Sequence, residues 1–170
     1  LTSSVGIETS NTNGSIGITT ELITGISTVG VATGYLIVNQ HFRGNAKVKE
    51  IGTNEVRANM DSTNTAAANS QFVQFLGMTT VFTSPNKSIL VGGTFANLTN
   101  NNVNISVEVG KVGAGLTLAS IANDIPVPTG SSFVIADAGK TILNTDDQIR
   151  VYCDTDNAID VTLSMLEGIN

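Results

Sequence analysis

A regular alternation of apolar and polar residues in the second half of the chain constrains its fold more than any other feature. Between Val103 and Val109 every second residue is Val or Ile, and Asn, Ser and Glu stand between them. The same period of two recurs from Ile149 to Cys153 and from Ile159 to Met165. Successive side chains of a β-strand point to opposite faces of a sheet, so each segment predicts a strand with one buried face.

Further short apolar runs extend this pattern over residues 71–170, and turn-forming Pro, Gly, Asn and Asp separate them. The expected strands are Phe72–Thr83, Ile89–Leu98, Val103–Val109, Leu116–Ala122, Phe133–Ala136, Thr141–Leu143, Ile149–Cys153 and Ile159–Met165. Short strands at this spacing predict an all-β fold, an antiparallel β-sandwich or jelly-roll-like domain. No connection between them holds the amphipathic helix that a parallel α/β sheet requires.

The predicted sandwich core consists of the large apolar residues on one side of each strand. Its members are Phe72 or Phe75, Phe82, Phe95, Val103, Ile105, Val107, Val109, Phe133, Ile149, Val151, Val161 and Leu163. The composition agrees with a folded β domain, because 41% of the chain is hydrophobic and only 13% is charged. Frequent Thr, Val and Ile favour strands, since their branched side chains lose χ1 freedom in a helix.

Residues 1–40 are expected to form an extended arm rich in Gly and Thr. Apolar residues recur there without a helical stripe, and Gly17, Gly25, Gly30 and Gly34 would each cost a helix about 1 kcal/mol. Short strands broken by turns are the alternative. Such a segment has few residues with which to build a core of its own. We expect it to be buried by pairing with a neighbouring subunit or by lying on another protein.

Residues 41–70 are mostly polar and are expected to connect the arm to the sandwich, with one short helical turn near Asn54–Asn59. A basic cluster lies in this connector, formed by His41, Arg43, Lys47, Lys49 and Arg57 and interrupted by Glu50 and Glu55. The chain as a whole has a net charge of −6, which disfavours a nucleic-acid partner. The cluster is interpreted as a solvated or inter-subunit face. No apolar run is long enough to predict a membrane-spanning helix, so no membrane partner is expected.

Side chains able to carry out catalysis are few. The single His, His41, lies beside basic residues in the connector. The single Cys, Cys153, occupies an apolar position of a strand and is expected to be a buried, unreactive thiol. No nucleophile elbow and no phosphate-binding glycine loop is present. The sequence therefore predicts a protein that is not an enzyme, with no catalytic, cofactor-binding or metal-binding residue.

Five aspartates near the C-terminus form the one group of titratable residues to be weighed. They are Asp146, Asp147, Asp154, Asp156 and Asp160. Asp favours turns because its carboxylate accepts hydrogen bonds from nearby backbone N–H groups, and turns are the preferred interpretation. A surface calcium site is the alternative, although the glycine and the terminal Glu of a calcium loop are missing. Glycoside hydrolysis is disfavoured because sugar sites usually present aromatic platforms, and the chain has no Trp.

The C-terminal stretch from Ile125 to Ile169 carries motifs of a known family. The matching residues are Pro126, Pro128, Gly130, Ser131 and Ser132, then Lys140 and Leu143, then Asp147, Ile149 and Val151, and finally Asp160, Val161, Leu163, Ser164, Leu166 and Glu167. This stretch resembles a recurrent domain of virion structural proteins in T4-like tailed phages, notably those of marine cyanobacteria. The Gly-Ile-Thr and Gly-Val-Ala-Thr-Gly segments near the N-terminus are similar to the repetitive arms of phage fibres and decoration proteins. The resemblance implies a homotrimer.

The resemblance also implies a structural protein on the surface of the virion. In one expected role it decorates or cements the capsid, with the arm bound to the major capsid protein lattice and the sandwich facing outward. In a second it belongs to a tail or fibre. A third class is a carbohydrate-binding or receptor-binding module, for which Tyr152 is the candidate contact residue. Tyr152 alternates with Val151 and Cys153, so it is expected on the sandwich exterior.

Overall fold

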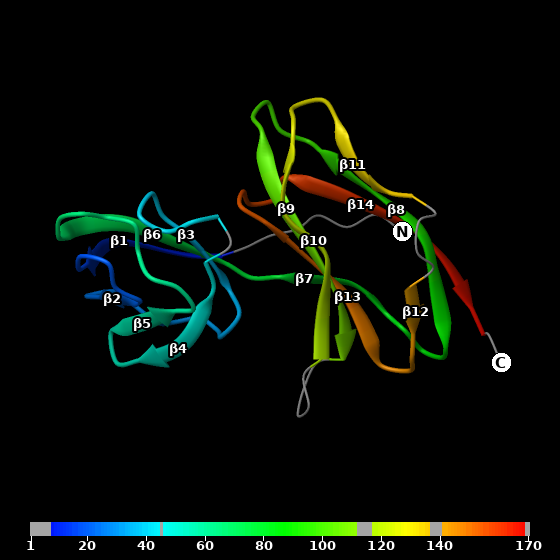
Figure 1. Cartoon of the computed structure of the whole chain (residues 1–170), viewed down its shortest axis with the longest axis horizontal. Helices are drawn as coiled ribbons and strands as arrows, with labels where there is room; N and C mark the ends of the chain where they lie inside the picture. Colours follow the sequence, from blue (N-terminus) through cyan, green and yellow to red (C-terminus); the bar gives the residue numbers. More distant parts are fainter. Residues whose placement is uncertain (1–7, 45, 112–116, 137–140, 169–170) are drawn as a thin grey trace. The chain divides into compact units, whose positions relative to one another are not determined.

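The computed structural model describes residues 8–44, 46–111, 117–136 and 141–168. These residues form β-strands and no helix, and every pair of neighbouring strands is antiparallel. The all-β prediction is confirmed. The chain divides into two compact units, of which the first ends at Met78 and the second begins at Thr79 (Figure 1).

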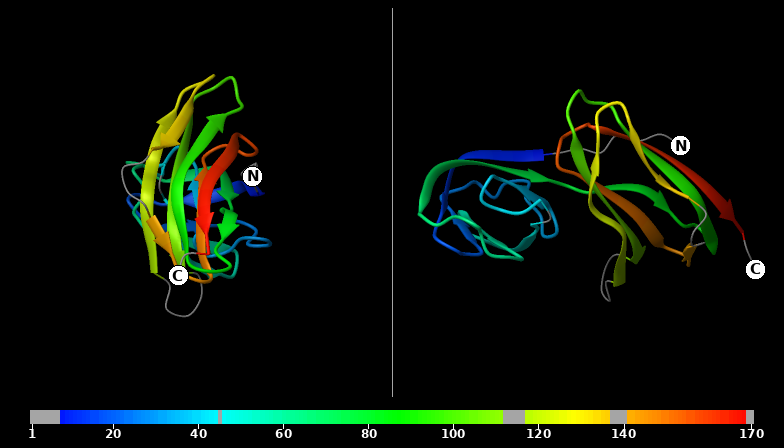
Figure 2. Two further views of the ribbon diagram at one scale, coloured as in Figure 1. Left: turned by 90° about the vertical axis from the view of Figure 1, so that its right-hand side faces the viewer. Right: turned by 45° about the horizontal axis from the view of Figure 1, so that its top comes forward.

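The second unit is a sandwich of two antiparallel sheets. The β9 sheet has the order β10-β9-β13-β7, and the β8 sheet has β8 at its centre, with β14 on one side and both β11 and β12 on the other (Figure 2). Their strands are β7 (Thr79–Thr83), β8 (Ser88–Asn97), β9 (Val103–Lys111), β10 (Thr117–Val127), β11 (Ser132–Ile135), β12 (Thr141–Leu143), β13 (Asp147–Cys153) and β14 (Ile159–Glu167).

The core of the sandwich lies between the two sheets and follows the sequence alternation. Val107 pairs with Val151 and Val109 with Ile149 across β9 and β13, and all four side chains are buried. From the β8 sheet come further buried residues, among them Phe95. Of the predicted core, the buried members are Phe95, Val103, Ile105, Val107, Val109, Ile149, Val151 and Val161, and Phe82, Phe133 and Leu163 are partly buried against them.

The first expected strand, Phe72–Thr83, is divided between the two units. It consists of β6 (Ala68–Leu76) and β7, and Gly77 and Met78 lie between them. The domain boundary that was expected near residue 70 therefore follows residue 78. Phe75 is buried in the first unit rather than in the sandwich, and Phe72 is 54% exposed.

The first unit is a small six-stranded barrel. Its strands are β1 (Glu8–Ile16), β2 (Leu22–Thr24), β3 (Leu36–Val38), β4 (Val48–Gly52), β5 (Glu55–Ala58) and β6, in the order β3-β6-β1-β2-β5-β4. The two ends of this sheet meet, because the N–H of Gly34 donates to the carbonyl of Val48 at 2.7 Å and the N–H of Val48 donates to that of Tyr35 at 2.8 Å. A bridge between Leu36 and Lys47 completes the closure. Closure thus joins β3 and β4, the two end strands of the sheet.

This barrel has its own core, which corrects the expected arm and connector. The buried residues are Ile16, Ile23, Ile26, Ile37, Phe42, Ala46, Val48, Val56, Ala58, Val73 and Phe75. Neither residues 8–40 nor residues 41–76 supply enough apolar side chains alone, but their strands interleave. β1 pairs with β6, more than fifty residues later in the chain, and β2 pairs with β5. The first seven residues of the expected arm lie outside the described residues.

The helical turn expected near Asn54–Asn59 is also wrong. Residues Glu55–Ala58 form β5, which pairs with β4 as a hairpin. Asn54 lies in the turn with a φ of 57°. Asn adopts this left-handed conformation at lower cost than most residues, so the polar Thr53-Asn54 pair is a hairpin turn rather than the start of a helix.

Candidate functional site

The side of the β8 sheet that faces away from the sandwich core is called the outer face below. Its residues alternate with the buried residues of β8 and β14 and are neighbours across the strands. They are Ile89, Val91, Gly92, Thr94 and Ala96 on β8, Asp160, Thr162, Ser164 and Leu166 on β14, Ser132 and Val134 on β11, and Ile142 on β12.

Large apolar side chains gather on the outer face. Ile142, Ile89 and Leu166 stand in one row across β12, β8 and β14. Ile142 and Leu166 are each 55% exposed, Val134 is 53% exposed and Val91 is 44% exposed. Nine large apolar residues are exposed in the part of the chain that the structure describes, and four of them lie on this single face. Such clustering marks an interaction surface more often than scattered exposure does.

Among the described residues, the outer face is also nearly uncharged. Asp160 is its one charged residue, and Glu167 alternates to the other side, opposite the buried Ser88. Gly92 lies near the middle of the face, where an added Cβ would come within 3.1 Å of the Ile135 carbonyl oxygen. A side chain there would disturb the neighbouring strand. Because Gly92 has none, no side chain projects from the sheet at this position.

Sequence reasoning missed the outer face. Ile142 belongs to a strand of only three residues, Thr141–Leu143, which is too short for alternation to indicate its direction. Leu166 follows Met165 directly, so it looks like a continuation of the buried side rather than a member of the opposite one. The signal available in the sequence was the break in alternation at Met165-Leu166, since two successive apolar residues in a strand point to opposite faces.

Tyr152, the expected glycan contact, does not lie on an accessible surface. It points to the side of the β9 sheet opposite the core, as alternation predicts, yet its exposed fraction is 2%. Burial and the neighbouring Glu108 carboxylate raise the pKa of the Tyr152 phenol above its usual value. The prediction that Tyr152 is exposed is wrong, because alternation gives a direction but not whether that face is covered.

Cys153 is buried, as predicted, and burial raises the pKa of its thiol to about 12. Such a thiol stays protonated at neutral pH and is a poor nucleophile. The neighbouring Asp154 accepts a hydrogen bond from the backbone N–H of Asn104 at 2.9 Å. Burial raises the pKa of this carboxyl group above its usual range, and the bond from Asn104 opposes the rise. Asp154 thus fixes the end of β13 against the start of β9.

The five aspartates do not converge. Asp146 precedes β13 and Asp147 is its first residue, whereas Asp154 and Asp156 lie after its end, so about 20 Å of strand separates the two pairs. Asp147 accepts a hydrogen bond from the N–H of Asn144 at 2.7 Å, and Asp146 has a φ of 70°. Both observations fit the turn interpretation. Within residues 8–44, 46–111, 117–136 and 141–168, no three His, Cys, Asp or Glu side chains are grouped to hold a metal ion.

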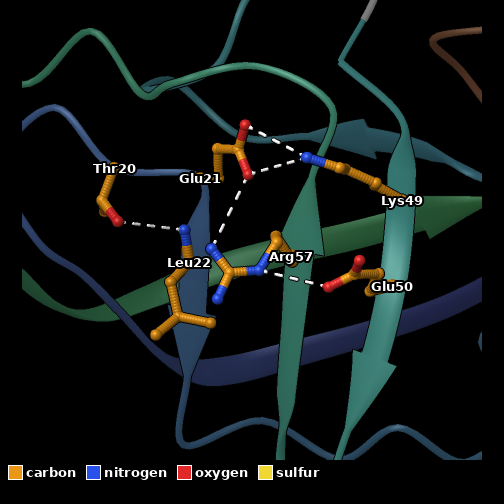
Figure 3. A network of polar contacts seen from close by, with 6 residues as sticks. All are labelled: Thr20, Glu21, Leu22, Lys49, Glu50 and Arg57. Carbon is orange, nitrogen blue, oxygen red and sulfur yellow. Dashed lines mark hydrogen bonds and ion pairs between the residues drawn. The ribbon is translucent and has the colours of Figure 1, made fainter.

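Part of the predicted basic cluster forms an exposed charge network on the barrel. The carboxylate of Glu21 lies 3.2 Å from Lys49 Nζ and 3.6 Å from an Arg57 nitrogen, and Arg57 Nε lies 3.3 Å from Glu50 (Figure 3). These contacts join β4, β5 and the start of β2. Exposed pairs of this kind contribute about 0–1 kcal/mol each. Because acidic groups alternate with basic ones, the network is not a basic patch.

A second exposed feature of the barrel surrounds Phe72. Asn39 donates from Nδ2 to the Phe72 carbonyl at 2.8 Å, and Gln40 donates to Gln71 Oε1 at 3.0 Å. His41 Nε2 lies 3.3 Å from the Gln40 amide nitrogen. The Phe72 ring is exposed, and the Asn39 amide bonds the Phe72 backbone carbonyl. An exposed aromatic ring is an apolar platform, and the neighbouring amides are hydrogen-bonding groups.

Comparison of the chain with protein-family models, with curated proteins and with solved structures found no match. The residues that carry the phage resemblance are distributed over the second unit. Ile149, Val151 and Val161 belong to its core, whereas Leu166 and Ser132 lie on the outer face. Lys140 is outside the described residues. The motif thus combines residues that stabilise the sandwich with residues of its exposed sheet.

Proposed function

We propose that this protein is a structural component of a tailed-phage particle, located on the particle surface, where it decorates or cements the capsid. The resemblance of residues 125–169 to virion structural proteins supports this role. A tail or fibre position is the structural alternative and requires the same kind of surface. In either place the protein acts by binding other proteins rather than by chemistry.

The outer face of the β8 sheet is the observation that carries this proposal. Interface cores are depleted of charged residues and enriched in large apolar ones compared with the rest of a protein surface. The outer face has both properties on a chain with a net charge of −6. We assign it the role of an assembly surface.

In this proposal the barrel, rather than an extended N-terminal arm, binds the capsid. Residues 8–40 are strands and turns of the barrel, so they are not free to clamp a lattice as an extended segment. Residues 8–78 contain four basic and five acidic residues, a net charge of −1, whereas residues 79–170 contain four and nine, a net charge of −5. The nearly neutral barrel therefore suits contact with the major capsid protein better than the acidic surfaces of the chain do.

Immunogold labelling of purified phage particles encoded by the same genome tests the proposal. An antibody against the purified protein is expected to decorate intact particles, and the pattern of gold separates head from tail. Mass spectrometry of the same particles is expected to detect the chain in many copies. Absence of the protein from purified particles, with abundant protein in the infected-cell lysate, would show that it is not a virion component.

The exposed Phe72 supports receptor or carbohydrate binding as a second candidate function. Sugars stack on exposed aromatic rings, and Phe72 is 54% exposed, with the Asn39 amide bonded to its backbone carbonyl. A glycan array probed with the parent protein and with Phe72→Ala tests this role. Ile18→Ala is the control, because Ile18 is also an exposed apolar residue of the barrel, at 58%. Binding that Phe72→Ala removes and Ile18→Ala retains would favour it, and an array without signal would reject it.

A further inference from the structure

We propose that the outer face binds the same face of a second copy of this chain. A face that binds its own copy gives a two-fold dimer, with two β8 sheets packed face to face, in place of the homotrimer that the phage resemblance implies. This inference rests on the proposed function, for which it names one partner of the assembly surface. Ile142 of each copy then contacts Leu166 of the other copy.

Charge favours a second copy on this face. Each molecule has a net charge of −6, so two copies repel one another wherever their carboxylates approach. Residues 79–170 contain thirteen charged residues, four basic and nine acidic. Among those that the structure describes, Asp160 is the one that belongs to the outer face. Contact through this face brings two acidic molecules together at a surface with few carboxylates to repel one another.

The pattern of residues on the face complements itself. Packed sheets keep their strand directions within about 30° of each other. A two-fold axis that runs along β8 places β14 of one copy over β11 and β12 of the other. The row Ile142–Ile89–Leu166 then meets its own copy in reverse order, so apolar side chains face apolar side chains. At the other end Asp160 meets the Ser132 hydroxyl, because both lie in the row of Ala96.

The two Asp160 carboxylates remain apart in this arrangement. β14 lies about 5 Å to one side of the axis in each copy, and the sheets are about 10 Å apart, which separates the two residues by about 14 Å. That distance exceeds the Debye length of about 8 Å at physiological ionic strength, so their repulsion is weak wherever solvent reaches the two carboxylates.

The size of the face predicts a reversible dimer. The face is three strands wide, at about 4.8 Å per strand, and about nine residues long, at about 3.4 Å per residue. These dimensions give a flat projected area of about 400 Å² per copy, to which protruding side chains add. Two such areas amount to about 800 Å², which is below the value of about 1,000 Å² for a stable specific interface and fits a weak, transient one. The absence of a side chain at Gly92 allows the two sheets to approach.

Light scattering coupled to size-exclusion chromatography tests the inference over a range of protein concentrations. The full chain is expected to be a dimer that dissociates on dilution. Ile142→Asp and Leu166→Lys are each expected to weaken association at least about tenfold, because each places a charge against an apolar residue of the partner. Ile18→Asp is the matched control, since Ile18 is 58% exposed and Ile142 is 55% exposed. It is expected to dimerise like the parent.

Mixing the two weakened variants tests the contact between residues 142 and 166. In a mixed dimer the new Asp faces the new Lys, and the second pair keeps the original Ile142 and Leu166. Dimers are therefore expected to return in the mixture and in neither variant alone. Thermal melts that match the parent would show that both variants fold.

Three results would overturn the inference: a monomeric parent at all concentrations, a trimer, or an equal loss of association in Ile18→Asp. Failure of the mixture to form dimers would also overturn it. None of these results bears on the presence of the protein in purified particles. Immunogold labelling therefore distinguishes failure of the dimer from failure of the proposed function.

Discussion

Val107 lies in the middle of β9 and is fully buried, with Ala122 of β10 and Val151 of β13 as its cross-strand neighbours. Val107→Asp would place a lone carboxylate in the sandwich core without a partner. We expect this change to unfold the sandwich, with a loss of more than about 4 kcal/mol in unfolding free energy. Circular dichroism during thermal or urea unfolding measures the effect.

Thr83→Asp is the matched control, since Thr83 is an exposed strand residue that receives the same charge. Its unfolding free energy is expected to stay within about 0.5 kcal/mol of the parent value. A Val107→Asp protein that melts like the parent would mean that Val107 is not in the core.

The buried thiol of Cys153 makes stability depend on alkaline pH. Its pKa is about 12 in the folded protein, compared with an ordinary value of 9.0. Above pH 9 the unfolded chain has lost this proton while the folded protein still holds it, so the unfolding free energy falls as pH rises. The slope approaches about 1.4 kcal/mol per pH unit and ends near pH 12. Urea unfolding between pH 8.5 and pH 10 measures this slope. The unfolding free energy of Cys153→Ala is expected to fall less steeply with pH, because the variant lacks the proton that the thiol releases on unfolding.

The parent and Cys153→Ala are compared by slope rather than by absolute stability, because the variant also leaves a small cavity. Tyr152 is buried too, and its raised pKa gives both proteins a further loss above pH 10. Identical slopes below pH 10 would contradict the raised pKa of the thiol.

At the scale of elements, closure of the barrel depends on the segment before β3. Gly34 has a φ of 86°, a left-handed conformation that favours glycine, and its N–H bonds to the Val48 carbonyl. Gly34→Ala is expected to destabilise the barrel by about 1 kcal/mol, since the added Cβ finds space but not a favourable backbone. Hydrogen exchange at the amides of Ile37 and Val48, which also donate across the closure, should become faster.

Gly17→Ala is the control for Gly34→Ala, because Gly17 does not have a positive φ and an added Cβ would lie 3.4 Å from Thr20, an ordinary contact. It is expected to leave the exchange of Ile37 and Val48 unchanged. Rapid exchange of these two amides in the parent protein would mean that β3 and β4 do not close the barrel.

The sequence predicted the sandwich strands well because their signal is local. Within Val103–Val109, Ile149–Cys153 and Ile159–Met165 apolar residues alternate with more polar ones, and this period can be read within a single strand. The barrel carries no such signal. β2 and β3 contain three residues each, and β1 pairs with a strand more than fifty residues away, so neither its partner nor its buried side follows from neighbouring residues.

The candidate site was less predictable than the fold. The outer face consists of residues from β8, β11, β12 and β14, and its apolar row forms only when the register brings Ile142, Ile89 and Leu166 side by side. Register is set by long-range pairing, which a linear pattern does not contain. The failure at Tyr152 has the opposite origin, since its direction was right and its burial depends on what covers the face.

At the scale of the whole molecule, the two units have separate cores and no residue is shared between the two buried clusters. Each core is therefore expected to unfold as its own cooperative unit. Val107→Asp should abolish slow hydrogen exchange in β9 and β13 while slow exchange persists in β1 and β6. Val73→Asp should do the reverse, because Val73 is fully buried in the barrel. Mass spectrometry of peptides from the two units measures the exchange rates of both in the full chain. Loss of slow exchange in both units of either variant would mean that the two cores fold only together.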